Sequence, residues 1–424
     1  MDVRTWIEID KKALHHNVEQ FLRLIPKKTR FMAVVKSNAY GHGLVHVAKQ
    51  LAEFRSSSLE FRGSSPNSKF KIQNSRIWFG VDSITEGLRL RKEGIKNHIL
   101  VLGYTLPSRL EEAAAAGIAV TVSSPEALKA LVRVGKRPVF HIKIDTGMHR
   151  QGFLPTQALD IIRQLKRNHL APEGVFTHFA AAKDPAYPTY TLMQAEDFQR
   201  VVAAFRRTGY SRVIRHAAAS GGTLLFPETH LDMVRIGIGI YGYWPSQEAK
   251  IGFTLLSSLR APKGRGNPVR KTATVDYGIA SSQPPRNDNA FELEPVLSWK
   301  AIVSEVKEIS AGSYVGYDLT ERVSRKTIIA VLPIGYWHGY DRGLSGVGEV
   351  LIRRRRAKVL GRISMDMTVV DATNIPRVCV GDTAILLGKD GEEEILADEL
   401  SLRIGTTPYE VLTRINPLIR RVVI

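Results

Sequence analysis

The fold follows from one stretch, Phe31-Met32-Ala33-Val34-Val35-Lys36-Ser37-Asn38-Ala39-Tyr40-Gly41-His42-Gly43. Its first five residues form an apolar run typical of a buried strand, its end is polar, and residues 44–54 have the apolar spacing of an amphipathic helix. This unit of strand, loop and helix recurs to about residue 244. Such alternation predicts a parallel sheet, and eight units fit a closed (β/α)8 TIM-like barrel of the α/β class. Its strands are expected at 31–35, 77–81, 99–102, 119–122, 139–144, 174–177, 213–215 and 233–236.

Beyond about residue 243 the pattern changes to short alternating runs punctuated by Gly and Asp. These runs predict a second, mainly β domain, and the alternating run 6–9 is expected to pair with it. We therefore predict a barrel over 11–244 and a mainly β domain formed by 1–10 and 245–424. Two polar stretches, 55–76 and the basic 257–290, resemble insertions and are expected to be surface loops. The strands of the second domain are expected at 297–306, 327–332, 349–352, 358–360, 367–370 and 382–387.

The chain is ordinary in composition but strongly basic. Its 424 residues include 60 Lys and Arg against 41 Asp and Glu, a formal net charge of +19. This charge suggests affinity for polyanions, but no zinc-finger, leucine-zipper or RNA-binding pattern accompanies it, so nucleic-acid binding is not expected. The densest basic run, 353–356, lies between two apolar runs and is predicted to form the tip of a hairpin.

Three absences bear on the compartment. No apolar run is long enough to span a membrane, and the first residues lack an apolar signal core. The single cysteine, Cys379, can form neither an intramolecular disulfide nor a cysteine-based metal cluster. We expect a cytoplasmic protein with no membrane partner and no metal site.

Candidate chemistry follows the strand ends, because barrel enzymes place their active sites at the carboxyl ends of the strands. Lys36 directly follows a buried strand and would be partly desolvated, which favours the free amine that forms a Schiff base. Lys143 and Arg150 follow the fifth strand, where they could bind anions. Barrel enzymes often bind phosphate after strands seven and eight, so Ser220 and the glycine-flanked segment 237–238 are phosphate candidates.

These strings resemble the motifs of the alanine racemase family, and the resemblance extends over nearly the whole chain. It is carried by residues 34–43, 141–150, 216–222, 233–242, 361–367 and 405–411. The family combines a barrel with a C-terminal β domain and uses pyridoxal 5′-phosphate. The resemblance implies that Lys36 carries this cofactor. The other cofactor-binding residues that it implies are Tyr40, His178, Ser220, Arg235, Gly237, Ile238 and Tyr409.

The resemblance also assigns residues to the substrate. Arg150 and the backbone N–H of Met365 are implied to bind the substrate carboxylate. Lys143, whose counterpart in the family is often carbamylated, is implied to support Arg150, and Tyr336 is implied to lie in the channel that admits the substrate. Arg235 is implied to face the ring nitrogen of the cofactor. Since a guanidinium only donates, that nitrogen stays unprotonated and the ring is a weaker electron sink, which limits side reactions.

The implied reaction is the interconversion of L- and D-alanine by two bases on opposite faces of the cofactor-bound amino acid, which supplies D-alanine for peptidoglycan. Lys36 is one base, and a tyrosine is the other. Tyr317 has the correct upstream context, whereas Tyr277 resembles the family only locally, so Tyr317 is preferred. In the family this tyrosine comes from a second subunit, which implies a homodimer.

Several departures keep alternatives open. Trp337, His338, Asp318 and Glu321 stand where the family has other residue types, and Ala219 replaces an asparagine near the phosphate. These changes allow a degenerate racemase with weak activity. A broad-specificity racemase shares the motifs but usually carries an export signal. A decarboxylase of the same fold would need a catalytic cysteine in a matching motif, and a pyridoxal-phosphate homeostasis protein would lack the β domain.

Overall fold

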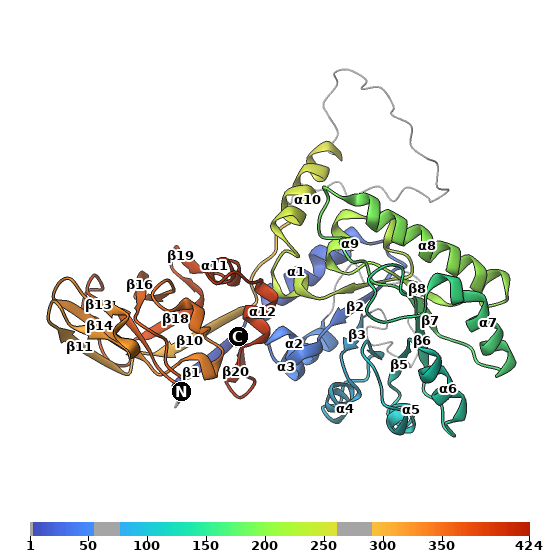
Figure 1. Ribbon diagram of the computed structural model, residues 1–424, viewed down its shortest axis with the longest axis horizontal. Coiled ribbons are helices and arrows are strands. Elements are labelled where there is room, and N and C mark those ends of the chain that lie inside the picture. The colour runs from blue at the N-terminus through green and yellow to red at the C-terminus, as the bar shows by residue number, and fades with distance from the viewer. Residues whose placement is uncertain (1–2, 55–76, 261–290) are drawn as a thin grey trace, which may run out of the picture.

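The computed structural model describes residues 3–54, 77–260 and 291–424. Figure 1 shows a barrel with its helices at one end of the molecule and a mainly β unit at the other. Among the described helices, none has the length and apolar character needed to cross a membrane. The predicted loop 55–76 and most of 257–290 lie outside the described residues. Residues 257–260 belong to helix α10 (Gln247–Arg260), so the expectation of a loop was wrong there.

Eight parallel strands form the barrel in the order β8-β7-β6-β5-β4-β3-β2-β9, which confirms the predicted architecture. The strands at the two ends of this order, β8 and β9, are joined by two backbone hydrogen bonds, from Asp232 N to Arg215 O (3.1 Å) and from Arg235 N to Ala218 O (3.0 Å), which close the barrel. Most residues of these strands are apolar and buried, because helices cover the outside and side chains fill the inside. The barrel strands are β2 (Arg30–Val34), β3 (Ile77–Val81), β4 (Ile99–Val101), β5 (Ala119–Val122), β6 (Phe140–Lys143), β7 (Gly174–Phe176), β8 (Ile214–His216) and β9 (Met233–Ile236).

The barrel helices begin and end close to the predicted positions. Ser124 caps one of them by accepting a hydrogen bond from Ala127 N, and Pro125 takes its first position, as the sequence predicts. The helices before α10 are α1 (Lys11–Leu24), α2 (Lys36–Tyr40), α3 (Leu44–Glu53), α4 (Ile84–Lys92), α5 (Leu110–Ala115), α6 (Pro125–Arg133), α7 (Ala158–Arg167), α8 (Pro188–Arg207) and α9 (Ser220–Leu225).

The C-terminal part is mainly β, and the first strand of the chain belongs to it. Strand β1 (Thr5–Ile9) pairs antiparallel with β10 and parallel with β20, as expected for the run 6–9. Two short helices, α11 (Ala397–Arg403) and α12 (Pro408–Thr413), complete this part. Its other strands are β10 (Leu297–Ile302), β11 (Glu305–Ile309), β12 (Tyr314–Val315), β13 (Glu321–Arg322), β14 (Thr327–Leu332), β15 (Glu349–Ile352), β16 (Arg355–Leu360), β17 (Thr368–Asp371), β18 (Thr383–Asp390), β19 (Glu393–Ile395) and β20 (Arg420–Val423).

The run 297–306, predicted as one strand, is two strands. The backbone changes partners between β10 and β11, because Val303 N donates to Asp382 O (2.7 Å) whereas Ser304 N donates to Val331 O (2.8 Å). Strand β10 therefore pairs with β18, and β11 pairs with β14. An apolar pattern alone does not reveal such a change of partner.

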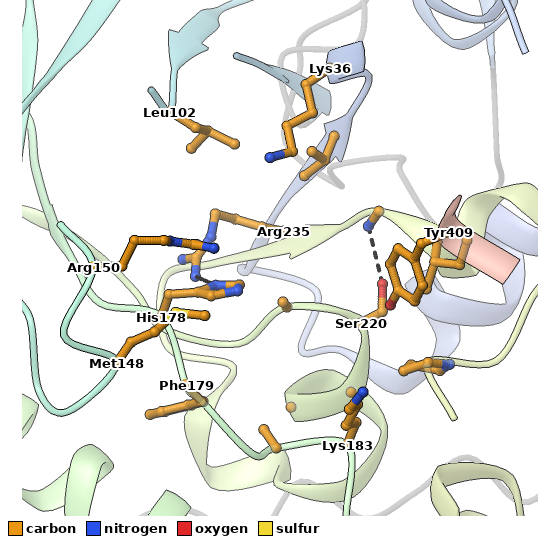
Figure 2. Close-up of a pocket in the computed structure, with 18 of the residues that line it drawn as sticks. Lys36, Leu102, Met148, Arg150, His178, Phe179, Lys183, Ser220, Arg235 and Tyr409 are labelled. Atoms are coloured by element: carbon orange, nitrogen blue, oxygen red, sulfur yellow. Dashed lines mark hydrogen bonds between the residues drawn. The ribbon is translucent and has the colours of Figure 1, made fainter. Parts of the chain in front are cut away.

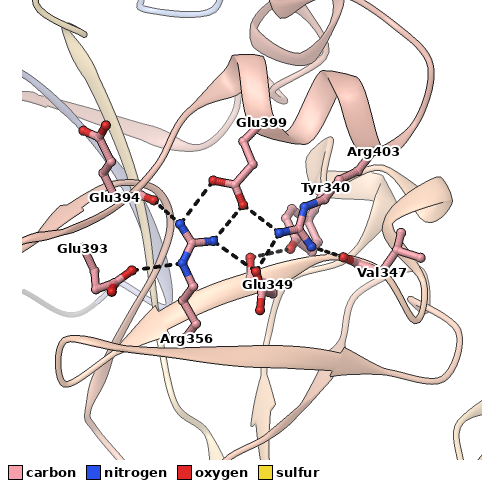
Figure 3. A network of polar contacts seen from close by, with 8 residues as sticks. All are labelled: Tyr340, Val347, Glu349, Arg356, Glu393, Glu394, Glu399 and Arg403. Atoms are coloured by element: carbon pink, nitrogen blue, oxygen red, sulfur yellow. Dashed lines mark hydrogen bonds and ion pairs between the residues drawn. The ribbon is translucent and has the colours of Figure 1, made fainter.

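Two arginines of the basic run at the tip of the β15–β16 hairpin are paired with acids. Arg353 pairs with Asp382 (2.7 Å). The side chain of Arg356 reaches Glu349, Glu393 and Glu399 at 3.0, 2.9 and 2.7 Å. Figure 3 shows this arginine joining strands β15, β16 and β19 to helix α11.

Replacement of Arg356 with alanine is expected to destabilise the C-terminal part. Three carboxylates would lose their shared donor, and the remaining like charges would repel each other. We expect the free energy of unfolding to fall by about 1–3 kcal/mol, the range for losing hydrogen bonds to charged groups. Urea denaturation of the wild type and the variant measures this difference in the free energy of unfolding. Arg163→Ala, which removes an exposed pair within helix α7, is the control and should change little.

Candidate active site

A cavity of about 650 Å³ opens at the carboxyl ends of the barrel strands. Figure 2 shows the amine of Lys36 pointing into it, toward the side where Arg150, His178 and Arg235 gather. Ser220 and Tyr409 lie at the other side. The cavity is strongly cationic, since among the described lining residues Asp82 is the one acid. The lining cations are Lys36, Lys143, Arg150, Lys183 and Arg235.

Lys36 begins an unusual backbone turn. The next four residues, Ser37 to Tyr40, have φ of 55°, 55°, 52° and 52°, a left-handed turn of non-glycine residues. Such residues cost about 1–2 kcal/mol each in this conformation. Hydrogen bonds offset the strain, since Glu86 Oε1 accepts from Ser37 N (2.7 Å) and Asn38 Oδ1 accepts from Leu44 N (3.0 Å). The turn directs both Lys36 and Tyr40 into the cavity.

The C-terminal part supports this turn from outside the barrel. A Cβ on Gly41 would lie 2.1 Å from Leu412 O in α12, so only glycine fits there. The guanidinium of Arg421 in β20 donates to Gly41 O through Nε (3.2 Å) and Nη2 (2.9 Å). The position of Lys36 therefore depends on residues almost 400 positions away in the sequence.

The loop that carries Arg150 is organised by a single carboxylate. Asp145 Oδ1 accepts from the backbone N–H groups of Gly147, Met148 and His149, and its Oδ2 accepts from Arg150 N at 2.9 Å. Burial acts to raise the pKa of Asp145, but these four donors outweigh it and lower the pKa. The carboxylate thus stays charged and holds the loop over the cavity.

Lys143 is a buried residue of the cavity lining. Burial, followed by the charges of Arg150 and Arg235, lowers the pKa of the Lys143 amine to about 8. Its Nζ donates to Gln151 Oε1 at 3.2 Å. A substantial share of this amine is therefore neutral slightly above neutral pH.

Arg235 lies inside the barrel and is 4% exposed. Its Nη2 donates to the carbonyl oxygens of Thr177 and Ala217, both at 2.7 Å, and lies 3.4 Å from His178 Nδ1. Burial lowers the pKa of Arg235 to about 9, so it stays protonated at neutral pH. Burial and the cations Arg235, Lys143, Arg150 and Lys36 lower the pKa of His178 to about 3, so this ring is neutral.

The side of the cavity opposite Arg150 fits a phosphate. Ser220 Oγ accepts from Gly237 N (3.1 Å), and a Cβ on Gly237 would lie 2.6 Å from the hydroxyl of Tyr40. The hydroxyl of Ser220, the glycine backbone and the tyrosines 40 and 409 thus form a small polar cradle. Burial raises the pKa of Tyr40 to about 12 and that of Tyr409 further, so both can donate to an anion. A group with an aldehyde at Lys36 and a phosphate at Ser220 fits these residues.

The structure brings together most, but not all, of the residues expected from the sequence. Lys36, Tyr40, Lys143, Arg150, His178, Ser220, Arg235, Gly237, Ile238 and Tyr409 line the cavity. Tyr317, Tyr336 and Met365 are not among the described lining residues; they are exposed on the C-terminal part, Tyr317 by 66%. Tyr277 lies outside the described residues. The two acids beside Tyr317 are paired, Asp318 with Arg362 (2.7 Å) and Glu321 with Lys358 (3.5 Å).

Other lining residues did not emerge from the sequence. Asp82 lies 3.9 Å from the amine of Lys36, and its position directly after a strand could have indicated it. Lys183 lies in the loop between β7 and α8 and has no comparable signal. His216, at the end of β8, contacts Arg235 from within the barrel rather than from the cavity.

Comparison with known proteins agrees with this arrangement of cavity and domains. The family model "Alanine racemase, N-terminal domain" matches residues 9–59 and 68–245, and the model "Alanine racemase, C-terminal domain" matches residues 296–423. The chain belongs to the alanine racemase family. It is 34% identical to the alanine racemase of Leptospira interrogans serovar Lai, over 99% of this chain and 96% of that protein. It is 37% identical to the alanine racemase of Symbiobacterium thermophilum, over 98% of this chain and 96% of that protein.

Solved alanine racemases have the same fold. The enzyme from Bacillus anthracis with bound L-Ala-P matches with a TM-score of 0.80 and 30% identity, covering 100% of this chain and 96% of that one. The enzyme from Clostridium difficile 630 matches with a TM-score of 0.81, 29% identity and the same coverage. The chain is thus a pyridoxal-phosphate-dependent racemase that acts on alanine, in keeping with the family.

Proposed function

We propose that Lys36 and Tyr317 are the two bases of the alanine racemase reaction and that the D-alanine formed serves peptidoglycan synthesis. The single observation that supports Lys36 is its amine, which enters a cationic cavity opposite a phosphate cradle. The barrel over 11–244 would hold the cofactor, and the unit of 1–10 and 245–424 would supply Tyr317.

Bound pyridoxal phosphate would act as an electron sink that makes the α-hydrogen of alanine acidic. The phosphate would lie between Ser220, the backbone of Gly237 and Ile238, and the hydroxyls of Tyr40 and Tyr409. Arg235, being permanently a donor, would face the ring nitrogen and leave it without a proton. Arg150 would bind the carboxylate of alanine and so fix which face of the α-carbon each base meets.

The two bases would then move protons on opposite faces. The amine of Lys36 would exchange the α-proton on the face of D-alanine, and the hydroxyl of Tyr317 would exchange it on the face of L-alanine. His178, neutral and beside Arg235, would orient the tyrosine.

For the exposed Tyr317 to act on the cofactor, a second subunit would have to bring it to the cavity. The C-terminal part exposes several large apolar side chains besides Tyr317, and exposed apolar surface of this kind marks interfaces. In a head-to-tail homodimer this surface would cover the cavity of the partner, and Tyr317, Tyr336 and the N–H of Met365 would enter its active site. The exposed residues of this surface are Tyr314, Tyr317, Leu319, Tyr336, Trp337, Met365 and Met367.

Chiral chromatography of a panel of amino acids, incubated with the protein and added cofactor, tests the substrate. We expect fast racemisation of alanine and at least about a hundredfold lower kcat/KM for arginine and lysine, whose long side chains would clash with Tyr317 and Tyr336 in the shared site. Equal turnover of these amino acids would favour a broad-specificity racemase.

Light scattering measures the oligomeric state, for which we expect a dimer. A monomer at assay concentration would contradict the shared active site.

Carbamylation of Lys143 is a separate prediction. A neutral buried amine next to Arg150 can take up carbon dioxide, and the carbamate formed would pair with the arginine. We expect 13C-labelled bicarbonate to give a carbamate resonance that grows as the pH rises toward about 8, where the neutral amine becomes abundant. The resonance should disappear in Lys143→Met and persist in Lys49→Met. Its persistence in Lys143→Met would place the carbamate elsewhere.

A further inference from the structure

A buried row of hydrogen bonds descends from Arg235 through the inside of the barrel. Arg235 Nη1 lies 2.9 Å from His216 Nδ1, His216 Nε2 lies 2.9 Å from His141 Nδ1, and His141 Nε2 lies 3.1 Å from Glu173 Oε2. Both histidines are 0% exposed. Since His141 is near the start of β6 and Glu173 precedes β7, the row runs from the cavity to the amino-terminal end of the barrel.

The two ends of the row fix its protons. A guanidinium can only donate, so the favoured arrangement has His216 Nδ1 as the acceptor and the ring proton of His216 on Nε2. That proton is donated to His141 Nδ1, which leaves the proton of His141 on Nε2, directed at Glu173. Every donor thus points away from Arg235 and toward the carboxylate.

Electrostatics preserve this arrangement. Burial lowers the pKa of His216 and of His141, so neither ring takes a second proton near neutral pH. Burial acts to raise the pKa of Glu173, but the hydrogen bond from His141 and nearby His98 and Arg30 outweigh it and lower the pKa. Glu173 is therefore an anion and accepts from His141.

Because packing fixes the ring of His216, the positions of the ring protons are the main feature of the row that can change. The ring of Phe176 stacks on His216 at 4.7 Å with an interplanar angle of 8°, so the imidazole cannot turn away. If His141 carried its proton on Nδ1, His216 would have to accept on Nε2 and carry its own proton on Nδ1. That N–H would face the N–H of Arg235, and the two donors would push the guanidinium aside.

We propose that Glu173 is a positioning residue, which acts through His141 and His216 to hold the guanidinium of Arg235 where the cofactor ring nitrogen lies. The carboxylate of Glu173 accepts from His141 Nε2 and so keeps the proton of His141 on that atom, which excludes the tautomers that would turn the N–H of His216 toward Arg235. The inference rests on one part of the proposed function, namely that Arg235 faces the ring nitrogen of the bound cofactor.

Two variants at one position separate acceptor from charge. Glu173→Leu removes the acceptor, whereas Glu173→Gln keeps an amide oxygen that can accept from His141. We expect Glu173→Leu to lower kcat about tenfold, with KM for alanine changed less than about twofold, because one hydrogen bond in the chain to a charged group is lost. Glu173→Gln should restore most of kcat. Glu294→Gln, which removes an exposed carboxylate 3.8 Å from His16, is the matched control.

The protons are measured directly by 15N NMR of histidine rings in the full chain with bound cofactor. In the wild type we expect His216 to be protonated on Nε2 only. In Glu173→Leu a population protonated on Nδ1 should appear, which a purely structural role for Glu173 would not produce. His216→Gln and His141→Gln assign the resonances.

The outcomes separate this inference from the proposed function. A wild-type His216 protonated on Nδ1 would overturn the inference even if no variant folds. Unchanged tautomers together with wild-type kcat in folded Glu173→Leu would overturn it as well. Failure of the wild type to racemise alanine would contradict the proposed function instead, since the tautomers of the row are read without turnover.

Discussion

Replacement of Lys36 with alanine is expected to abolish racemase activity, by at least about a thousandfold, because the chain loses both the covalent attachment of the cofactor and one of the two bases. The absorption band of covalently held cofactor should disappear at the same time. Borohydride reduction followed by peptide mass spectrometry should find a pyridoxyl group on residue 36 of the wild type and none in the variant.

The control for Lys36→Ala is Lys49→Ala, which removes a surface lysine paired with Glu93 at 2.8 Å. This variant should retain the absorption band and nearly full activity, since exposed pairs contribute little. Full activity in Lys36→Ala would refute the assignment of the cofactor lysine. A pyridoxyl group found on Lys143 or Lys183 instead would move the attachment within the same cavity.

Replacement of Tyr317 with alanine is expected to lower kcat by about a hundredfold or more, the loss typical for a general acid or base. Cofactor binding should persist, because Tyr317 is not among the described residues that line the cavity of its own chain. The variant Tyr277→Ala should keep its activity. The reverse result would transfer the role of base to Tyr277.

Mixing two inactive variants tests whether the active site is shared. In a dimer of one Lys36→Ala chain and one Tyr317→Ala chain, one site has both bases and the other has neither. After unfolding and refolding at equal amounts, half of the dimers are mixed, so about a quarter of wild-type activity should return. Mixed dimers isolated by two affinity tags that remain inactive would show that both bases belong to one chain.

The sequence alone determined the architecture of the barrel. Most of its strands are short apolar runs followed by a helix, and this local pattern suffices because both faces of a parallel sheet are buried. The cavity residues at strand ends, such as Lys36 and Arg150, followed from the same reasoning, since the carboxyl ends of the strands meet at one face.

Other features were decided only by the tertiary structure. The left-handed turn after Lys36 is unfavourable locally and persists because Glu86, Leu412 and Arg421 surround it. The row from Arg235 to Glu173 joins side chains from separate strands, and no periodicity reveals which buried histidines touch. Local sequence pattern specifies where helices and strands form, whereas contacts between distant residues arise only when the chain has closed on itself.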